Sequence, residues 1–209
     1  NIEGLVELLR DIGAKYDLSG LLLSVAAFRT DRSDYRDLDP LATTPFVDNE
    51  ARTQGIELGL AGAVGPVSLS GGYVYIDSEF RNGANDGNRL PNTAKHNVSL
   101  WSQVAITDRF DIGGGAYYAG KRFADPSNDI EVPDYWRFDA MASYQVTDNI
   151  GVRLNVKNIA DERYVEKPRN PHFFVPGQGR QAPRPRPSNR GNMAEKSRPM
   201  PSSSSTNCR

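Results

Sequence analysis

The segment from Arg137 to Ile159 reads RFDAMASYQVTDNIGVRLNVKNI and contains two alternating runs. In the first run the even positions from Phe138 to Val146 are apolar or aromatic, while most odd positions are polar. The second run repeats this pattern from Ile150 to Val156. Because successive side chains of a strand point to opposite faces, each run predicts a strand with one apolar and one polar face. Only Thr147-Asp148-Asn149 separates the runs, which predicts a tight hairpin.

Six further stretches alternate in a similar way, so the chain is predicted to be all-β. The eight predicted strands are Ile12–Leu18, Leu21–Arg29, Gly55–Ala63, Val67–Asp77, Asn97–Thr107, Phe110–Tyr118, Arg137–Thr147 and Asn149–Ile159. Long connections rich in Asn, Asp, Pro and Gly are predicted at about Ser33–Glu50, Arg81–His96, Ala124–Asp134 and Glu162–Pro176. Four hairpins with tight turns at one end and long polar loops at the other are typical of an antiparallel transmembrane β-barrel, with short periplasmic turns and long outer loops.

Composition agrees with a barrel segment. The chain is 38% hydrophobic with a mean hydropathy of -0.57, and no apolar run approaches the ~20 residues of a spanning helix. Aromatic residues near the predicted strand ends indicate girdles at the two membrane interfaces, although aromatic residues are frequent in any sheet. The predicted girdle residues are Tyr16, Tyr35, Tyr117, Tyr118, Tyr135, Trp136 and Tyr164. Glycines 113–115 are predicted to allow close packing or curvature in the wall.

Charge, cysteine and histidine content exclude several function classes. The net charge of -1 gives no indication of nucleic-acid binding. A single cysteine, Cys208, cannot form an internal disulfide. The two histidines, His96 and His172, fall in separate predicted loops, so no metal site built by the protein is expected. No Ser-His-Asp grouping can be assembled from the spacing, and no enzyme activity is predicted.

The two ends of the chain differ from the middle. Residues 182–209 are rich in Arg, Pro and Ser and contain no aromatic residue, which predicts a disordered tail. Residues 1–10 contain Leu5, Val6, Leu8 and Leu9 in a pattern more typical of a helix. The chain starts with Asn1 rather than Met, so the sequence itself does not show secretion. Removal of a leader and an incomplete piece are the two hypotheses for this start.

Five short motifs carry a family resemblance. They are RTQGIEL at Arg52–Leu58, LPNTAKH at Leu90–His96, YWRFD at Tyr135–Asp139, LNVKNIADERY at Leu154–Tyr164 and PGQGR at Pro176–Arg180. Each resembles a motif in the late strands of TonB-dependent outer-membrane receptors, and they occur in that family's order. The resemblance points to the ferric-siderophore receptors and covers roughly Gly13 to Gln181. The predicted division is therefore an unmatched stretch 1–10, a C-terminal part of a receptor barrel 11–181, and the tail 182–209.

This resemblance implies a plugged barrel of about 22 strands. Such receptors bind an iron-loaded chelate outside the cell and import it with energy supplied through TonB. Only the last part of that barrel is matched, so TonB is expected to act only through a plug absent from this chain. The expected location is the outer membrane of a Gram-negative bacterium, in contact with its lipid, provided that the chain inserts. A truncated or frame-shifted product without independent transport is a further hypothesis.

Ferric siderophores are the expected ligands. Chelates of this kind are rich in oxygen and commonly anionic, so cationic and aromatic side chains of the outer loops are suitable contacts. The candidates are Tyr35, Arg36, Arg81, Arg89, Lys121 and Arg122. The alternative is that they are ordinary solvated loop residues. No directly bound cofactor is expected, because iron would arrive inside its siderophore.

A different architecture is also compatible with the strand count. Eight strands suffice to close a small outer-membrane barrel with a structural or adhesive role. The family motifs argue against this alternative, because they belong to late strands of a larger wall.

Overall fold

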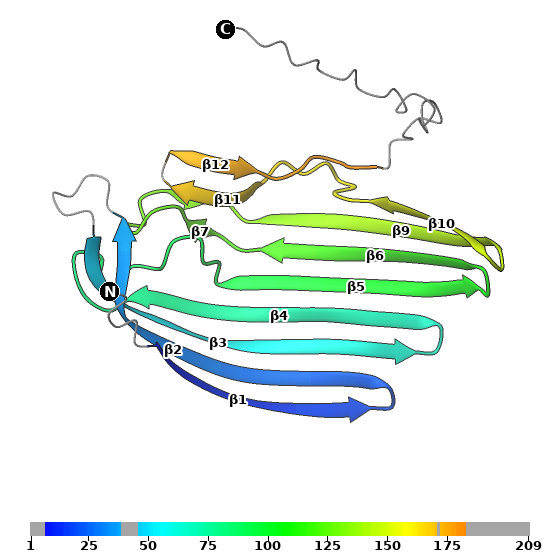
Figure 1. Ribbon diagram of the computed structural model, residues 1–209, viewed down its shortest axis with the longest axis horizontal. Helices are drawn as coiled ribbons and strands as arrows, with labels where there is room; N and C mark the ends of the chain where they lie inside the picture. Colours follow the sequence, from blue (N-terminus) through cyan, green and yellow to red (C-terminus); the bar gives the residue numbers. More distant parts are fainter. Residues whose placement is uncertain (1–6, 39–45, 171, 183–209) are drawn as a thin grey trace, which may run out of the picture.

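The computed structural model describes residues 7–38, 46–170 and 172–182, and every regular element in these ranges is a strand. Eight strands form one antiparallel sheet in which each strand pairs with its neighbours in the sequence (Figure 1). In sheet order they are β1 (Glu7–Leu18), β2 (Leu21–Leu38), β3 (Phe46–Val64), β4 (Val67–Phe80), β5 (His96–Thr107), β6 (Phe110–Ala119), β9 (Tyr135–Thr147) and β10 (Ile150–Val156). The predicted all-β fold and all eight predicted strands are confirmed.

Two-residue turns join the hairpins at one end of the sheet (Figure 1). Ser19 and Gly20 have φ angles of 52° and 95°, as a tight hairpin requires for a twist that matches its strands. Gly65 has a φ of 58° and precedes Pro66, which fits a turn with glycine at its first central position. The predicted short turns are therefore confirmed.

The long connections lie at the opposite end, and some contain more structure than predicted. The expected loop Ser33–Glu50 is largely wrong, because β2 extends to Leu38 and β3 begins at Phe46. Two small hairpins occupy other connections: β7 (Arg122–Phe123) pairs with β8 (Glu131–Val132), and β11 (Val165–Asn170) pairs with β12 (Phe173–Pro176). Pairing within these segments gives their backbone N–H and C=O groups hydrogen-bond partners. The polar composition of the segments indicated loops and did not reveal this pairing.

The ends of the chain also differ from expectation. The helix expected in residues 1–10 is wrong for residues 7–10, which pair with β2 from Glu7↔Arg32 to Arg10↔Arg29. Residues 1–6 and the predicted tail from 183 onward lie outside the described residues. At the other end, Lys157 and Gln181 form an isolated antiparallel bridge next to β10.

The pairing register places apolar residues of successive strands in common rows. One row runs Ala14, Val25, Leu58, Tyr73, Val98, Tyr118 and Trp136, each residue paired directly with the next. The exposed fractions of Val25, Leu58 and Trp136 are 45%, 46% and 45%. Such continuous apolar exposure is costly in water and is expected of a barrel wall whose outer face contacts lipid. The face with this row is called the outer face below, and the opposite face the inner face.

Aromatic residues gather near the loop end of the outer face. The rings of Tyr118 and Trp136 lie 4.9 Å apart, and the Tyr73 hydroxyl lies 2.9 Å from Nδ1 of His96. The girdle prediction is thus supported for Tyr118 and Trp136. It is wrong for Tyr117 and Tyr135, whose positions in the register turn their side chains to the inner face. Alternation along a strand decides the face, and proximity to a strand end does not.

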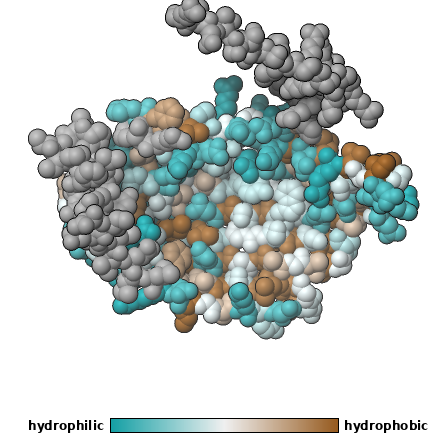
Figure 2. Space-filling model, in the orientation of Figure 1, coloured by the Kyte–Doolittle hydropathy of each residue, from teal (hydrophilic) through white to brown (hydrophobic). Residues whose placement is uncertain are grey.

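The inner face is mixed in character and includes an aromatic side chain packed on glycine. Figure 2 shows one face of the sheet, where residues of intermediate hydropathy cover much of the middle. On the inner face Trp101 pairs directly with Gly115, and a Cβ added at Gly115 would lie 2.6 Å from Cε3 of Trp101. Gly113 leaves similar room, since its added Cβ would lie 3.2 Å from Cζ2 of the same ring. The predicted close packing over glycines 113–115 is confirmed for these two.

The described part of the sheet is open. β1 and β10 are its first and last strands and do not pair with each other. No helix within the described ranges is long and apolar enough to cross a membrane.

We predict that Gly115→Ala lowers the free energy of unfolding by about 1–3 kcal/mol and therefore lowers the melting temperature, because the added methyl group must displace the Trp101 ring. The measurement is the temperature at which the folded, faster-migrating band disappears on a gel. Gly114→Ala is the matched control, since its Cβ would meet Asp139 O at an ordinary 3.6 Å. Equal melting temperatures for the two variants would contradict this packing.

Candidate functional site

The outer-loop end contains the residues predicted to contact ligand, and the structure groups only some of them. Arg89, Lys121 and Arg122 come together around β7: the Arg89 guanidinium lies 5.6 Å from the Phe123 ring centroid, and Lys121 Nζ lies 2.9 Å from Glu131 Oε1. Arg81 follows β4, where its Nη1 lies 2.6 Å from Glu79 Oε1.

Two other predicted contacts lie in the extension of β2. Tyr35 pairs with Asn49 and Arg36 pairs with Asp48 in the ladder between β2 and β3. Both are therefore strand residues and do not lie in the predicted loop. Their side chains are outside the described structure, so ligand contact by Tyr35 and Arg36 stays a prediction.

Two outer loops are joined by hydrogen bonds. The loop between β4 and β5 presents Arg89, whose N–H donates to Asn128 Oδ1 at 2.8 Å and whose carbonyl accepts from Asn128 Nδ2 at 3.0 Å. Asn88 Nδ2 donates to Pro126 O at 3.0 Å, and Asn92 N–H donates to Phe123 O at 2.7 Å. These contacts, called the loop latch here, make the two connections one structural unit.

Asp125 organises the second of these loops. Its carboxylate is 4% exposed and accepts from Ser127 Oγ and from the backbone N–H groups of Asp129 and Ile130. Burial opposes ionisation, but the hydrogen bonds outweigh it and hold the pKa of Asp125 below its ordinary value of 3.8. The ionised carboxylate therefore stabilises the turn that presents Asn128 to Arg89.

Arg122 has an exposed fraction of 4% and is the most buried of the predicted ligand contacts whose side chains the structure describes. Its Nε donates to Asn92 Oδ1 at 3.1 Å, and its Nη2 donates to Val165 O at 2.5 Å and Glu166 O at 3.3 Å. These bonds connect the loop latch to β11. Burial lowers the pKa of the Arg122 guanidinium from its usual range.

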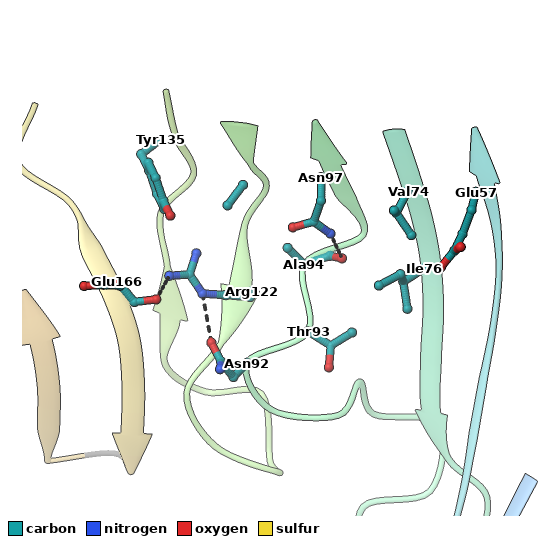
Figure 3. Close-up of a pocket in the computed structure, with 11 residues that line it drawn as sticks. Glu57, Val74, Ile76, Asn92, Thr93, Ala94, Asn97, Arg122, Tyr135 and Glu166 are labelled. Atoms are coloured by element: carbon teal, nitrogen blue, oxygen red, sulfur yellow. Dashed lines mark hydrogen bonds between the residues drawn. The ribbon is translucent and has the colours of Figure 1, made fainter. Parts of the chain in front are cut away.

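A hollow of about 560 Å³ lies beside Arg122 on the inner face (Figure 3). The strands of the large sheet contribute Glu57, Val74, Ile76, Asn97, Ala119 and Tyr135. The small hairpin strands β7 and β11 contribute Arg122 and Glu166, and the β4–β5 loop contributes Asn92, Thr93 and Ala94. The sequence patterns predicted Arg122 but not the others. Strand alternation places Glu57 and Asn97 on the polar face, but only the pairing register brings them into the same row across the sheet.

Two of the family-like motifs meet in space. Asn158 is 1% exposed; its Nδ2 donates to Glu162 O and to Gln178 O, each at 3.0 Å, and its Oδ1 accepts from Glu162 N. Arg180 N–H donates to Asp161 Oδ1 at 2.7 Å. The motif at Leu154–Tyr164 thereby holds the motif at Pro176–Arg180 beside it.

Asn128 and Asn158 were not anticipated as key residues. Both have positive φ angles, 62° and 52°, which asparagine tolerates better than most residues. An asparagine in a loop is a common signal for such a turn, but the partner of its side chain cannot be read from the sequence.

No group of three or more His, Cys, Asp or Glu side chains suited to a metal ion occurs in the described part of the chain. His96 instead contacts Tyr73 and Tyr75 on the outer face. The arrangement at the loop end provides hydrogen-bond donors and aromatic rings suited to an oxygen-rich ligand.

We predict that Asp125→Asn loosens the loop latch, because a neutral amide cannot replace the carboxylate that accepts three hydrogen bonds. In the unmodified protein the stabilisation is present at neutral pH and is lost as the pH falls through the folded-state pKa, which lies below 3.8. Hydrogen exchange at the amides of Asp129 and Ile130 measures this. These two amides should be less protected from exchange in the variant. Their protection should fall with decreasing pH in the unmodified protein and should not do so in the variant.

Asp129→Asn is the control for this experiment, since that side chain is exposed in the same loop. Equal exchange rates in the two variants would show that Asp125 does not hold the turn.

We predict that Asn158→Asp lowers the free energy of unfolding by about 1–3 kcal/mol, because it removes the two hydrogen bonds donated by Nδ2 and buries a charge. Limited proteolysis between residues 158 and 181 measures the loosening. Asn155→Asp makes the same chemical change at an exposed position of β10 and should leave the cleavage rate unchanged. Similar protection of both variants would argue against this tie between the motifs.

Comparison with known proteins identifies the family. The family model described as "TonB dependent receptor-like, beta-barrel" matches residues 10–159. The "Probable TonB-dependent siderophore receptor PiuA" of Acinetobacter baumannii is 35% identical, over 82% of this chain and 25% of that protein. The "Catecholate siderophore receptor Fiu" of Escherichia coli K12 is 34% identical, over 74% of this chain and 22% of the relative.

Solved structures agree with the sequence comparisons. The crystal structure of PiuA from Acinetobacter baumannii superposes with a TM-score of 0.76 and 33% identity, over 83% of this chain and 27% of that one. The closed form of Fiu from Escherichia coli K12 gives a TM-score of 0.70 and 31% identity, over 83% and 26%. The chain thus spans about a quarter of the length of these relatives.

The motif resemblance is confirmed by these matches, and the open eight-stranded sheet corresponds to part of a larger barrel wall. This chain belongs to the TonB-dependent receptor family, as a segment of its outer-membrane β-barrel in a Gram-negative bacterium.

Proposed function

We propose that the chain forms part of the wall and outer loops of a receptor for TonB-dependent uptake of ferric siderophores. The observation that carries this proposal is the match of residues 10–159 to the receptor barrel, together with relatives named as siderophore receptors at 34–35% identity. Because the chain spans about a quarter of those relatives, transport is proposed for the receptor as a whole.

The segment supplies a wall and a set of ligand-facing loops. The wall presents its apolar rows to outer-membrane lipid. The loop latch keeps the β4–β5 and β6–β9 connections in one arrangement, so their side chains meet a ligand with little ordering cost. Energy from TonB is proposed to act through a plug inside the barrel, and none of the described residues takes that part.

We retain six residues as proposed ligand contacts: Tyr35, Arg36, Arg81, Arg89, Lys121 and Arg122. Guanidinium and ammonium groups donate charge-assisted hydrogen bonds to chelate oxygens. Lys121 and Arg81 are ion-paired at accessible positions, where their side chains are 60% and 43% exposed. Iron is proposed to arrive inside the siderophore, with no cofactor bound directly by the protein.

The alternative of a self-contained eight-stranded barrel is not favoured. β1 and β10 stand at opposite edges of the described sheet, and the relatives are much longer than this chain. The hypothesis of a truncated or frame-shifted product stays untested, because it rests on the two ends of the chain, of which residues 1–6 and 183–209 lie outside the described structure.

The test is deletion of the gene that encodes this segment in its own bacterium, followed by uptake of ⁵⁵Fe supplied as different ferric siderophores to iron-starved cells. We expect uptake of at least one chelate to fall to the level of a strain lacking TonB, and the intact gene to restore it. The other chelates serve as internal controls, because other receptors carry them. If uptake of every chelate is unchanged by the deletion, the proposal is wrong.

A further inference from the structure

Arg122 is a buried cation without a carboxylate partner among the described residues. Its hydrogen-bond acceptors are the side-chain amide of Asn92 and the backbone carbonyls of Val165 and Glu166, all of them neutral groups. The third nitrogen, Nη1, is buried and has no hydrogen-bond partner. Burying an unpaired charge and an unused donor is costly, so native structures normally provide an acceptor, preferably an anion.

The unpaired nitrogen lies at the edge of the inner-face hollow. In Figure 3 Nη1 points away from Asn92 and Glu166, on the side where the hydroxyl end of Tyr135 approaches the guanidinium. The Arg122 guanidinium carbon lies 5.8 Å from the Tyr135 ring centroid. A phenolic hydroxyl and a guanidinium N–H can donate together to one oxygen-bearing group placed between them.

The hollow is open on one side and has the volume of a small-molecule site. Its volume of about 560 Å³ falls within the usual range for ligand pockets of ~300–1,000 Å³. Val74 and Ile76 supply an apolar wall, and Asn97 adds a polar group. Two carboxylates, those of Glu57 and Glu166, also line the hollow and oppose the binding of an anion there. Neither forms an ion pair with Arg122 among the described residues.

We propose that this hollow is an anion subsite, in which Arg122 and Tyr135 bind a carboxylate of the incoming ferric chelate. The inference rests on the proposed function and narrows the ligand to carboxylate-bearing chelates. A carboxylate suits the site because guanidinium groups favour planar, bidentate oxygen acceptors. Arg122 thereby couples ligand to the loop latch, since the same guanidinium holds Asn92 and β11.

An acidic side chain from another part of the receptor is the competing occupant. It offers the same carboxylate chemistry but would be present with or without ligand. A test must therefore show whether the site accepts a free anion.

The first experiment soaks crystals of the intact receptor in sodium bromide and locates bromide by its anomalous scattering. We expect a bromide peak within hydrogen-bonding reach of Arg122 Nη1, and no peak there in crystals of the Arg122→Gln variant. An acidic side chain paired with Nη1, or the absence of any peak, would overturn the subsite. This result does not depend on siderophore binding, so it remains decisive if the proposed function fails.

The second experiment measures binding of two iron chelates to the purified intact receptor, ferric citrate as the carboxylate and a ferric trihydroxamate as the neutral control. Arg122→Gln should weaken citrate binding by about tenfold or more, and should weaken trihydroxamate binding much less, because only citrate brings a carboxylate to Nη1. Arg122→Lys keeps the charge and should weaken citrate binding less. Equal effects on both chelates would indicate a merely structural role and overturn the assignment.

Failure of the unmodified receptor to bind either chelate would count against the proposed function, and the bromide experiment would then decide the anion subsite alone. Thermal unfolding of both variants shows whether the loop latch has collapsed. Tyr135→Phe is the second probe, because it removes only the hydroxyl, and it should weaken citrate binding without affecting Arg122 contacts.

Discussion

Continuous pairing between neighbouring strands is the constraint on which the rest of the structure depends. Inside a bilayer no water is available to satisfy backbone N–H and C=O groups, so every spanning strand needs a partner on each side. The eight-stranded sheet meets this need in simple sequential order, with each strand hydrogen-bonded to the next. Once the pairing is set, the register follows, and alternation places Val25, Leu58 and Trp136 in one row on the outer face. The open edges at β1 and β10 fit a segment of a larger wall.

The same register builds the inner face. It sets Trp101 against Gly115, and it brings Glu57, Asn97 and Tyr135 to the side of the sheet where the hollow lies. The strands thus give the hollow a rigid floor, while the loops supply its polar rim. Because the loop latch joins residues about forty positions apart, such as Arg89 and Asn128, the rim is stabilised by contacts that no single loop can make.

Arg122 connects the outer loops to the hollow on the inner face. It belongs to a two-residue strand in an outer loop, yet its guanidinium reaches Asn92 on one side and β11 on the other. A residue buried to this extent is commonly structural, and its hydrogen bonds support that role. Its unused Nη1 at the edge of the hollow adds a binding role, since a buried cation gains most from an anion where water is excluded. The two roles are compatible because different nitrogens serve them.

Local alternation in the sequence by itself determined the all-β fold, the eight strands and their tight turns, since side chains on a strand alternate wherever it packs. The motifs likewise identified the receptor family. The sequence did not reveal the strand extensions at Tyr35 and Phe46 or the hairpins within the loops, because these depend on pairing partners elsewhere in the chain. Likewise, the burial of Arg122 and the meeting of Asn158 with Gln178 were decided only by the tertiary structure. Loop charges look alike in a sequence, and only the neighbours that the fold supplies distinguish a solvated lysine from a buried guanidinium.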